Sequence, residues 1–251
     1  EHPELVKEVV SELINALDVE RKEIEAIHLA ERALAQIGSA ATQQLIEAMN
    51  APRLPTAQKR HVARTLGLLG DEHALPVLIE AIMNEPSDRI EGYLEAIACI
   101  GAGAVEPLIA ALEGQELSTS IGLIQALVRI GPPAIEPLVE AIAAHAPEIR
   151  RAAVYALGDI GTPAIEPLSH AMLHDGRYEV RRRALEILGR IGETDVASTL
   201  LQALDDPDPG VRIRAVRYLG TLGYEGAVQP LVSILQREDQ ISLQREVISS
   251  L

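Results

Sequence analysis

The segment that decides the fold is Val211–Gly223, VRIRAVRYLGTLG, in which spaced apolar residues lead up to a glycine. Val180–Gly192, VRRRALEILGRIG, and Arg150–Gly161, RRAAVYALGDIG, follow the same pattern. The glycine recurs at intervals of thirty to thirty-two residues, at Gly38, Gly70, Gly101, Gly131, Gly161, Gly192 and Gly223. Such a period is typical of a repeat array in which each unit packs only on its neighbours.

Each repeat predicts two helices, one on either side of the glycine. The stretch before the glycine, here called the A helix, has apolar residues three and four positions apart and ends in Ile or Leu. The stretch after it is the B helix, and in five repeats a proline stands six or seven residues beyond the glycine: Pro76, Pro107, Pro137, Pro167 and Pro230. A first helical turn tolerates proline because its amide has no helical partner. The glycine itself predicts a left-handed residue that closes the A helix.

The period predicts an all-α fold, an α-α superhelix of about seven helix pairs with a half-repeat at each end, forming one domain over 1–251. The predicted boundaries are 1–18 for the first half-repeat, 19–50, 51–84, 85–113, 114–143, 144–174, 175–206 and 207–237 for the full repeats, and 238–251 for the last half-repeat. Neither end shows the polar face of a capping repeat. We therefore expect the end helices to offer surfaces for association, or the chain to be part of a longer protein.

Composition excludes several classes of function. The formal charge is −15, from 37 acidic and 22 basic residues, which argues against binding to nucleic acid or to an anionic membrane. Apolar runs are expected to stay below the roughly 20 residues of a membrane span. With Cys99 as the single cysteine, no intrachain disulfide can form, which favours a cytoplasmic protein. Cys99 lies in an A helix, and we expect a buried, inert thiol there.

Several segments of the chain resemble HEAT repeats. They are Arg150–Gly161, Val180–Gly192 and Val211–Gly223, together with AIEPLVEAI at 134–142 and AIEPLSHAM at 164–172. More narrowly, they resemble the short HEAT-like repeats of phycobilisome bilin lyases. The resemblance implies stacked helix pairs whose B helices line a concave surface. Deoxyhypusine hydroxylase is similar in fold, but the adjacent His-Glu dyads that hold its iron do not occur in this chain.

The resemblance also implies a ladder between repeats, made by an Asp in the turn and an Arg six residues later. Residues with this spacing are Asp175 with Arg181, Asp206 with Arg212, and Asp239 with Arg245. Ala144 replaces the Asp that would precede Arg150. In the earlier repeats Lys59, Ile90 and Ser120 take the Arg position, so we expect no ladder in the amino-terminal half.

Residues on the exposed side of the B helices are the candidates for binding a protein partner. They are Glu47, Glu80, Glu106, Glu136, Glu140, Glu166, His170 and Gln202. Because carboxylates predominate, this set would attract a basic protein surface. The alternative interpretation is a solvated surface, since exposed helix positions are often Glu and a Glu in a first turn favours the helix dipole.

Two other groups of residues are candidate sites. The basic concentration consists of Arg150, Arg151, Arg181, Arg182, Arg183, Arg212, Arg214 and Arg217, and it predicts either ladder contacts with solvated surface or a site for carboxylates or phosphates. His170 and His174 have the i, i+4 spacing of zinc ligands, but no third ligand is evident. The sequence therefore predicts no metal, no cofactor and no catalytic residue.

The predicted function is a non-catalytic scaffold or adaptor that binds a protein partner of unknown identity through the concave B-helix surface. The alternative is a bilin lyase or phycobilisome-handling protein that binds a linear tetrapyrrole and its acceptor subunit. That alternative rests on the resemblance, with arginines pairing the propionates and Tyr155, Tyr178 or Tyr218 near the rings. A third interpretation is a regulatory or assembly segment of a larger protein.

Overall fold

The structure is a computed structural model that describes residues 3–17, 24–52, 54–237 and 241–250. Contacts divide the chain into two compact units, Glu1–Ala134 and Ile135–Leu251, and each unit is described by itself. All regular elements within the described residues are α-helices or short 3-10 helices, which confirms the predicted all-α class. The predicted repeat boundaries and the single domain stay predictions.

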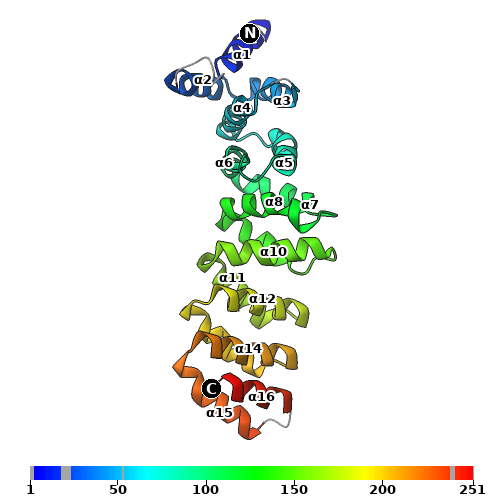
Figure 1. The fold of residues 1–251 in the computed structure, drawn as a ribbon, viewed down its shortest axis with the longest axis vertical. Coiled ribbons are helices and arrows are strands. Elements are labelled where there is room, and N and C mark those ends of the chain that lie inside the picture. Colours follow the sequence, from blue (N-terminus) through cyan, green and yellow to red (C-terminus); the bar gives the residue numbers. More distant parts are fainter. Residues whose placement is uncertain (1–2, 18–23, 53, 238–240, 251) are drawn as a thin grey trace. The chain divides into compact units, whose positions relative to one another are not determined.

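Unit 1 consists of two layers of helices (Figure 1). The A helices are α2 (Ile24–Ile37), α4 (Thr56–Leu69), α6 (Glu91–Ile100) and α8 (Leu117–Ile130). The B helices are α1 (Pro3–Asn15), α3 (Thr42–Asn50), α5 (Leu75–Asn84) and α7 (Val105–Ala111). Each A helix packs on the next A helix, and each B helix packs on the next B helix. Sequential neighbours therefore share one continuous interior within the unit.

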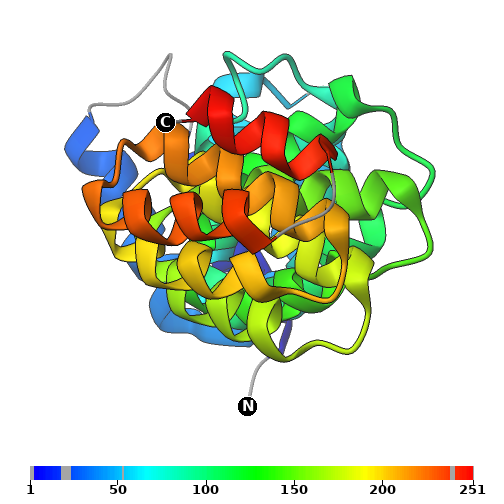
Figure 2. The same cartoon turned by 90° about the horizontal axis from the view of Figure 1, so that it is seen from below.

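Unit 2 also consists of A and B helices in alternation. Its B helices are α9 (Ile135–Ala141), α11 (Ile165–His174), α13 (Ala197–Gln202) and α15 (Val228–Arg237). Its A helices are α10 (Pro147–Ile160), α12 (Tyr178–Ile191), α14 (Pro209–Leu222) and α16 (Ile241–Ser250). Figure 2 shows α16 in red lying against the orange helices α14 and α15.

The repeat glycines end the A helices as predicted. Every A helix from α2 to α14 stops at the residue directly before its glycine, and the seven glycines have φ between 63° and 75°. Gly192 is left-handed, with ψ of 15°, whereas Gly161 has ψ of −134°, a conformation strongly unfavourable for residues with a Cβ. A 3-10 turn such as Thr162–Ala164 then leads into the B helix, and the sequence pattern did not predict these turns.

The interior is aliphatic in both units. Fully buried side chains include Leu66 and Leu78 in unit 1, and Leu157 and Leu168 in unit 2. Tyr93 of α6 is the largest fully buried side chain. Aliphatic side chains suit thin layers of helices that pack at short distance, as expected from the absence of Phe and Trp.

A second glycine, three residues before the repeat glycine, sets how closely A helices approach. At Gly67 an added Cβ would lie 2.5 Å from the Cα atom of Ala96 on the next A helix. At Gly189 the added Cβ would lie 2.4 Å from the ring of Tyr218. Gly158 is different, because the nearest atom to its added Cβ is the Cζ atom of Arg190, at 3.4 Å. Gly67 therefore permits a close backbone contact that Gly158 does not make.

Two expectations from the sequence were wrong. Cys99 is exposed rather than buried, because it lies on the outer side of α6. The helical stretch Glu91–Ala111 is 21 residues long and apolar enough, by length and composition only, to cross a membrane. It consists of α6 and α7, separated at Gly101 with φ of 73°, and both helices pack on their neighbours in unit 1. Length and composition alone are weak evidence, since core helices meet the same criterion.

The close contact at Gly67 predicts a difference between two Gly→Ala substitutions. Gly67→Ala should lower the free energy of unfolding by about 1–3 kcal/mol, because the methyl group would overlap backbone atoms of α6. Gly158→Ala should leave it unchanged or raise it by up to about 1 kcal/mol, because Ala favours the helix and Arg190 can move. Urea denaturation followed by circular dichroism measures both. Equal effects would contradict the close-approach role of Gly67.

Candidate functional site

In unit 2 the predicted binding residues lie on neighbouring B helices. Glu136 and Glu140 stand four residues apart on α9, Glu166 and His170 stand four apart on α11, and Gln202 ends α13. All five side chains are exposed. Helix α9 packs beside α11, and α11 packs beside α13. Along this order the predicted residues change from two Glu, to Glu and His, to Gln, so their negative charge declines.

In unit 1 the corresponding carboxylates are also exposed. Glu47 lies on α3, Glu80 on α5 and Glu106 on α7. Glu47 accepts a hydrogen bond from Gln43 Nε2 at 3.0 Å. Within the described ranges of both units, no ion pair joins the carboxylates of the predicted set to a basic side chain.

Helix position separates these carboxylates into two kinds. Glu106, Glu136 and Glu166 occupy the first turns of their helices, where the helix dipole favours a negative charge. Glu80 and Glu140 lie beyond the first turn, where this dipole effect does not stabilise them. The helix dipole therefore explains why part of the set is acidic. It does not explain Glu80 and Glu140, so these two residues are better evidence for a binding surface.

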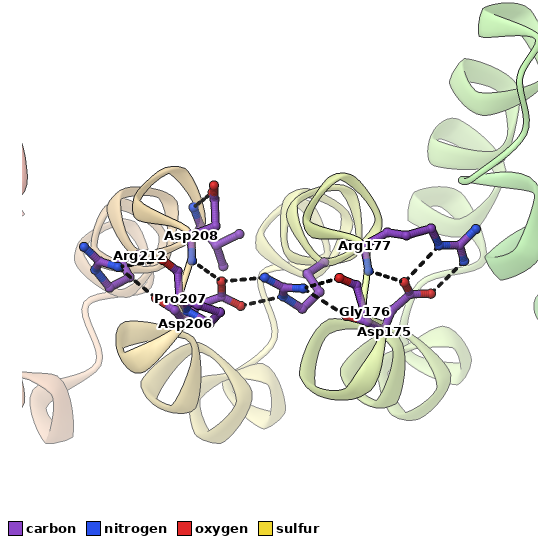
Figure 3. A network of polar contacts seen from close by, with 9 residues as sticks. Asp175, Gly176, Arg177, Asp206, Pro207, Asp208 and Arg212 are labelled. Carbon is purple, nitrogen blue, oxygen red and sulfur yellow. Dashed lines mark hydrogen bonds and ion pairs between the residues drawn. The ribbon is translucent and has the colours of Figure 1, made fainter.

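The polar ladder in unit 2 centres on the ion pair between Arg181 and Asp206. Figure 3 shows Asp206 with the dashed contacts that its carboxylate makes. Arg181 Nε donates to Asp206 Oδ2 at 2.8 Å, and Nη2 donates to Asp206 Oδ1 at 3.0 Å. Its Nη1 donates to the backbone oxygen of Asp175 at 3.0 Å. Arg181 and Asp206 are 8% and 7% exposed. The guanidinium thus joins its own turn to the turn of the next repeat through a buried bidentate ion pair.

The Arg at the ladder position donates to the backbone oxygen of the residue six positions before it, whether that residue is Asp or Ala. Arg212 Nη1 donates to the backbone oxygen of Asp206 at 2.9 Å, and Arg150 Nη1 donates to that of Ala144 at 2.7 Å. Ala144 therefore does not remove this bond. The Asp175 carboxylate pairs with Arg177, and the hydrogen bond from Arg177 lowers the pKa of Asp175.

Other predicted ladder positions behave differently. Asp239 lies outside the described residues. In unit 1, Ile90 is buried, Lys59 is half-buried, and the Ser120 hydroxyl donates to the backbone oxygen of Glu116 at 2.9 Å. The described part of unit 1 thus has no Arg-Asp pair at these positions.

Several remaining arginines contact their own unit. Arg183 donates to the backbone oxygen of Ile142 at 3.1 Å, Arg214 to that of Gly210 at 3.3 Å, and the guanidinium of Arg190 lies 5.0 Å from the ring centre of Tyr155. Arg150, Arg151, Arg183 and Arg190 line a pocket of about 270 Å³ on α10 and α12. Burial lowers the pKa of Arg183, and the charges of Arg150 and Arg182 add to this effect.

The His and Tyr candidates lie on different layers. The rings of His170 and His174 are 4.7 Å apart on α11, and no group of three metal-ligating side chains forms among the described residues. Tyr155, Tyr178 and Tyr218 lie on α10, α12 and α14, which are A helices. The tyrosines that the bilin-lyase alternative places near a tetrapyrrole are therefore not on the B helices.

Sequence reasoning missed one buried polar cluster. Glu31 of α2 is 2% exposed and contacts two histidine rings, His28 Nδ1 at 3.1 Å and His61 Nδ1 at 2.8 Å. His61 belongs to α4, so the cluster joins neighbouring A helices of unit 1. The sequence signal for this cluster is Glu31 itself, an acidic residue on the apolar face of an A helix.

Profile comparisons agree with this architecture. A profile of HEAT repeats matches residues 105–176 and 165–251, and a profile of the PBS lyase HEAT-like repeat matches residues 58–82. The chain belongs to the HEAT-repeat family. HEAT repeats are typically protein-binding modules. No curated protein sequence matches the chain.

Three solved structures are similar to this chain at low sequence identity. The Pds5-Scc1 complex gives a TM-score of 0.50 at 11% identity over 98% of this chain and 48% of the other, so this chain spans about half of it. Human deoxyhypusine hydroxylase in complex with glycerol gives 0.40 at 18% identity, covering 98% and 96% of the two chains. The complex of CpcE and CpcF of phycocyanin lyase from Nostoc sp. PCC7120 gives 0.34 at 21% identity, covering 95% and 93%. The last two likenesses are too distant to carry an argument.

The ladder predicts a large loss of stability when Asp206 is removed. Asp206→Ala should lower the free energy of unfolding by about 3–5 kcal/mol, because it leaves the buried Arg181 guanidinium without its ion pair. The control is Asp205→Ala, which removes an exposed carboxylate from the same turn and should change stability by less than about 0.5 kcal/mol. Both are measured by urea denaturation. Similar losses in the two variants would contradict a special role for the pair.

The ion pair between Arg217 and Glu246 predicts a pH dependence in unit 2. Arg217 Nε donates to Glu246 Oε1 at 2.8 Å and joins α14 to α16. This bond lowers the pKa of Glu246 below its ordinary value of 4.5. The stability from the pair should therefore be present above the ordinary pKa and lost as the pH falls through the lowered one.

Arg217→Gln tests this by denaturation at several pH values. The stability difference between the unmodified chain and the variant should be largest at neutral pH and shrink below about pH 4. Arg64→Gln, on the exposed side of α4, should show no such trend. A difference for Arg217→Gln that stays constant with pH would show that the pair does not depend on the Glu246 charge.

Proposed function

We propose that this protein is a non-catalytic scaffold or adaptor that binds the basic surface of a protein partner through the exposed carboxylates of its B helices. The observation that carries the proposal is the position of Glu80 and Glu140. They are exposed, lie beyond the first helical turn, and belong to a set that no described cation neutralises. Membership in the HEAT-repeat family supports a protein partner over other ligands.

The mechanism relies on a surface that exists before the partner arrives. The B helices are held by apolar contacts within each unit and, in unit 2, by the buried Arg181–Asp206 pair. Association with such a surface loses little conformational entropy on the scaffold side. Exposed carboxylates steer a basic partner and accelerate encounter, so binding should weaken as salt concentration rises.

The alternative of a bilin lyase rests on the resemblance alone. Its candidate tyrosines lie on A helices, and Tyr155 already contacts the guanidinium of Arg190. The absence of enzymatic activity remains part of the proposal, since it rests on the sequence prediction of no catalytic residue.

Charge reversal on unit 2 tests the proposal. The binding variant carries Glu136→Lys, Glu140→Lys and Glu166→Lys. The control carries the same charge change on exposed positions away from the B helices, at Glu95, Asp159 and Glu193, each changed to Lys. Partners are captured by cross-linking in an extract of the native host, identified by mass spectrometry, and then purified for measurement of affinity.

The binding variant should lose at least about tenfold in affinity for the partner, and the control should stay within about twofold. Glu140→Lys alone should weaken binding without loss of stability, because Glu140 makes no favourable contact with the helix dipole. Equal affinity of all three proteins, or equal loss in the binding variant and the control, would refute the B-helix carboxylates as the binding surface.

A further inference from the structure

Unit 1 contains a pocket of about 200 Å³ that includes Glu80 of the proposed binding surface. It is formed by the ends of α3 and α5 together with α4 and α6. Its polar lining consists of Asn50, Lys59, Glu80, Asn84, Glu85 and Tyr93. We refer to it as the Tyr93 pocket.

The Tyr93 pocket lies where unit 2 has its ladder pair. Lys59 stands eleven residues before Gly70, as Arg181 stands eleven before Gly192. Asn84 stands seventeen before Gly101, as Asp206 stands seventeen before Gly223. In unit 2 the two side chains at these positions satisfy each other through the buried ion pair. In unit 1 the neutral Asn84 cannot supply the carboxylate that an ion pair needs.

Tyr93 is a second, independent observation that indicates a ligand at this pocket. Its side chain is 0% exposed, it lines the pocket, and its hydroxyl has no hydrogen-bond partner among the residues that the structure describes. The equivalent positions in the other A helices, eight residues before the repeat glycine, carry apolar residues: Ala30, Val62, Leu123, Ala153, Ala184 and Ala215. A buried hydroxyl without a partner is destabilising, so its place in an otherwise apolar series requires an explanation.

The electrostatics of the pocket favour a cation. Glu80 and Glu85 carry two negative charges, Lys59 carries one positive charge, and no ion pair involves any of them in the described part of the chain. Burial raises the pKa of Tyr93, and the charge of Glu85 raises it further. The hydroxyl therefore stays neutral at physiological pH, and its oxygen can accept a hydrogen bond.

The size of the pocket and its hydrogen-bond acceptors favour the side chain of an arginine as the ligand. Pockets for small-molecule ligands usually measure about 300–1,000 Å³, so this one is smaller than the usual range. The lining residues carry acceptors on the carboxylates, on the Asn side chains and on the hydroxyl of Tyr93, which is itself buried. A planar guanidinium presents five donors, and it pairs with carboxylates in a bidentate way.

We propose that the Tyr93 pocket binds an arginine side chain of the protein partner. The partner thereby supplies, between Glu80, Glu85 and the Tyr93 hydroxyl, the guanidinium that Arg181 supplies from within the chain in unit 2. This inference rests on the proposed function, since it assumes a basic partner on the B-helix side.

The pocket is tested directly with a peptide probe on the full chain. Acetyl-Gly-Arg-Gly-amide is titrated while the amide resonances of Asn84 and Glu85 are followed by NMR. Peptides with citrulline or Glu in place of Arg are compared. The Arg peptide should shift these resonances saturably, and the citrulline peptide, which has the same shape without the charge, should bind at least about tenfold more weakly. No saturable shift, equal binding of citrulline, or preference for the Glu peptide would overturn the proposal.

Substitutions at Glu85 and Tyr93 test whether these two side chains contact the Arg peptide. Glu85→Gln should weaken the Arg peptide by about tenfold, whereas Glu95→Gln, on the exposed side of the same helix as Tyr93, should leave it unchanged. Tyr93→Phe should unfold at the same or a higher temperature, since it removes the unpaired hydroxyl, and should weaken binding about threefold. Unchanged binding in Tyr93→Phe would refute the role of the hydroxyl.

Rebuilding the ladder pair gives the complementary test. The double variant Lys59→Arg, Asn84→Asp places in unit 1 the residue types of Arg181 and Asp206, and it should abolish binding of the Arg peptide. Full binding by this variant would show that the pocket does not correspond to the ladder position. Failure of the peptide tests leaves the charge-reversal experiment on α9 and α11 unaffected, so the two proposals fail separately.

Discussion

The structure depends on apolar contact between neighbouring repeats. A helix pair of about thirty residues cannot bury its own apolar face, so its stability comes from the pairs on either side. Small residues at the contact between A helices, Gly67 against Ala96 above all, let these helices approach closely enough for an aliphatic interior without Phe or Trp. The polar contacts are added to this interior and do not replace it.

Much of the fold could be predicted because the constraint is periodic. The position of each repeat glycine gave the end of every A helix from α2 to α14, since a helix that meets a positive φ must stop there. The 3-10 turns after the glycines carry no such mark and were missed. Cys99 was misplaced because its neighbours on α6 are apolar, although helical spacing turns its own side chain outward.

The candidate sites were less predictable, because they depend on contacts between residues far apart in sequence. The carboxylates of the B helices could be named from their spacing. The family resemblance matched Asp175 with Arg181 and Asp206 with Arg212. The side-chain pairing of Arg181 with Asp206, twenty-five residues away, required coordinates to define. Tyr93 and Glu31 were not selected at all, since burial without a partner, or beside two histidines, is a property of the packed helices.

The two layers divide their charges in a way that suits a binding scaffold. On the A helices of unit 2, Arg181 and Arg190 contact groups of the same unit, whereas Glu136 and Glu140 on α9 remain exposed. The most direct test is hydrogen exchange of the chain with its identified partner bound. Amides of α9 and α11 should gain protection, while those of α10 and α12 stay unchanged. Protection of α10 and α12, or a general change in exchange across both layers, would contradict a preformed scaffold that binds through its B helices.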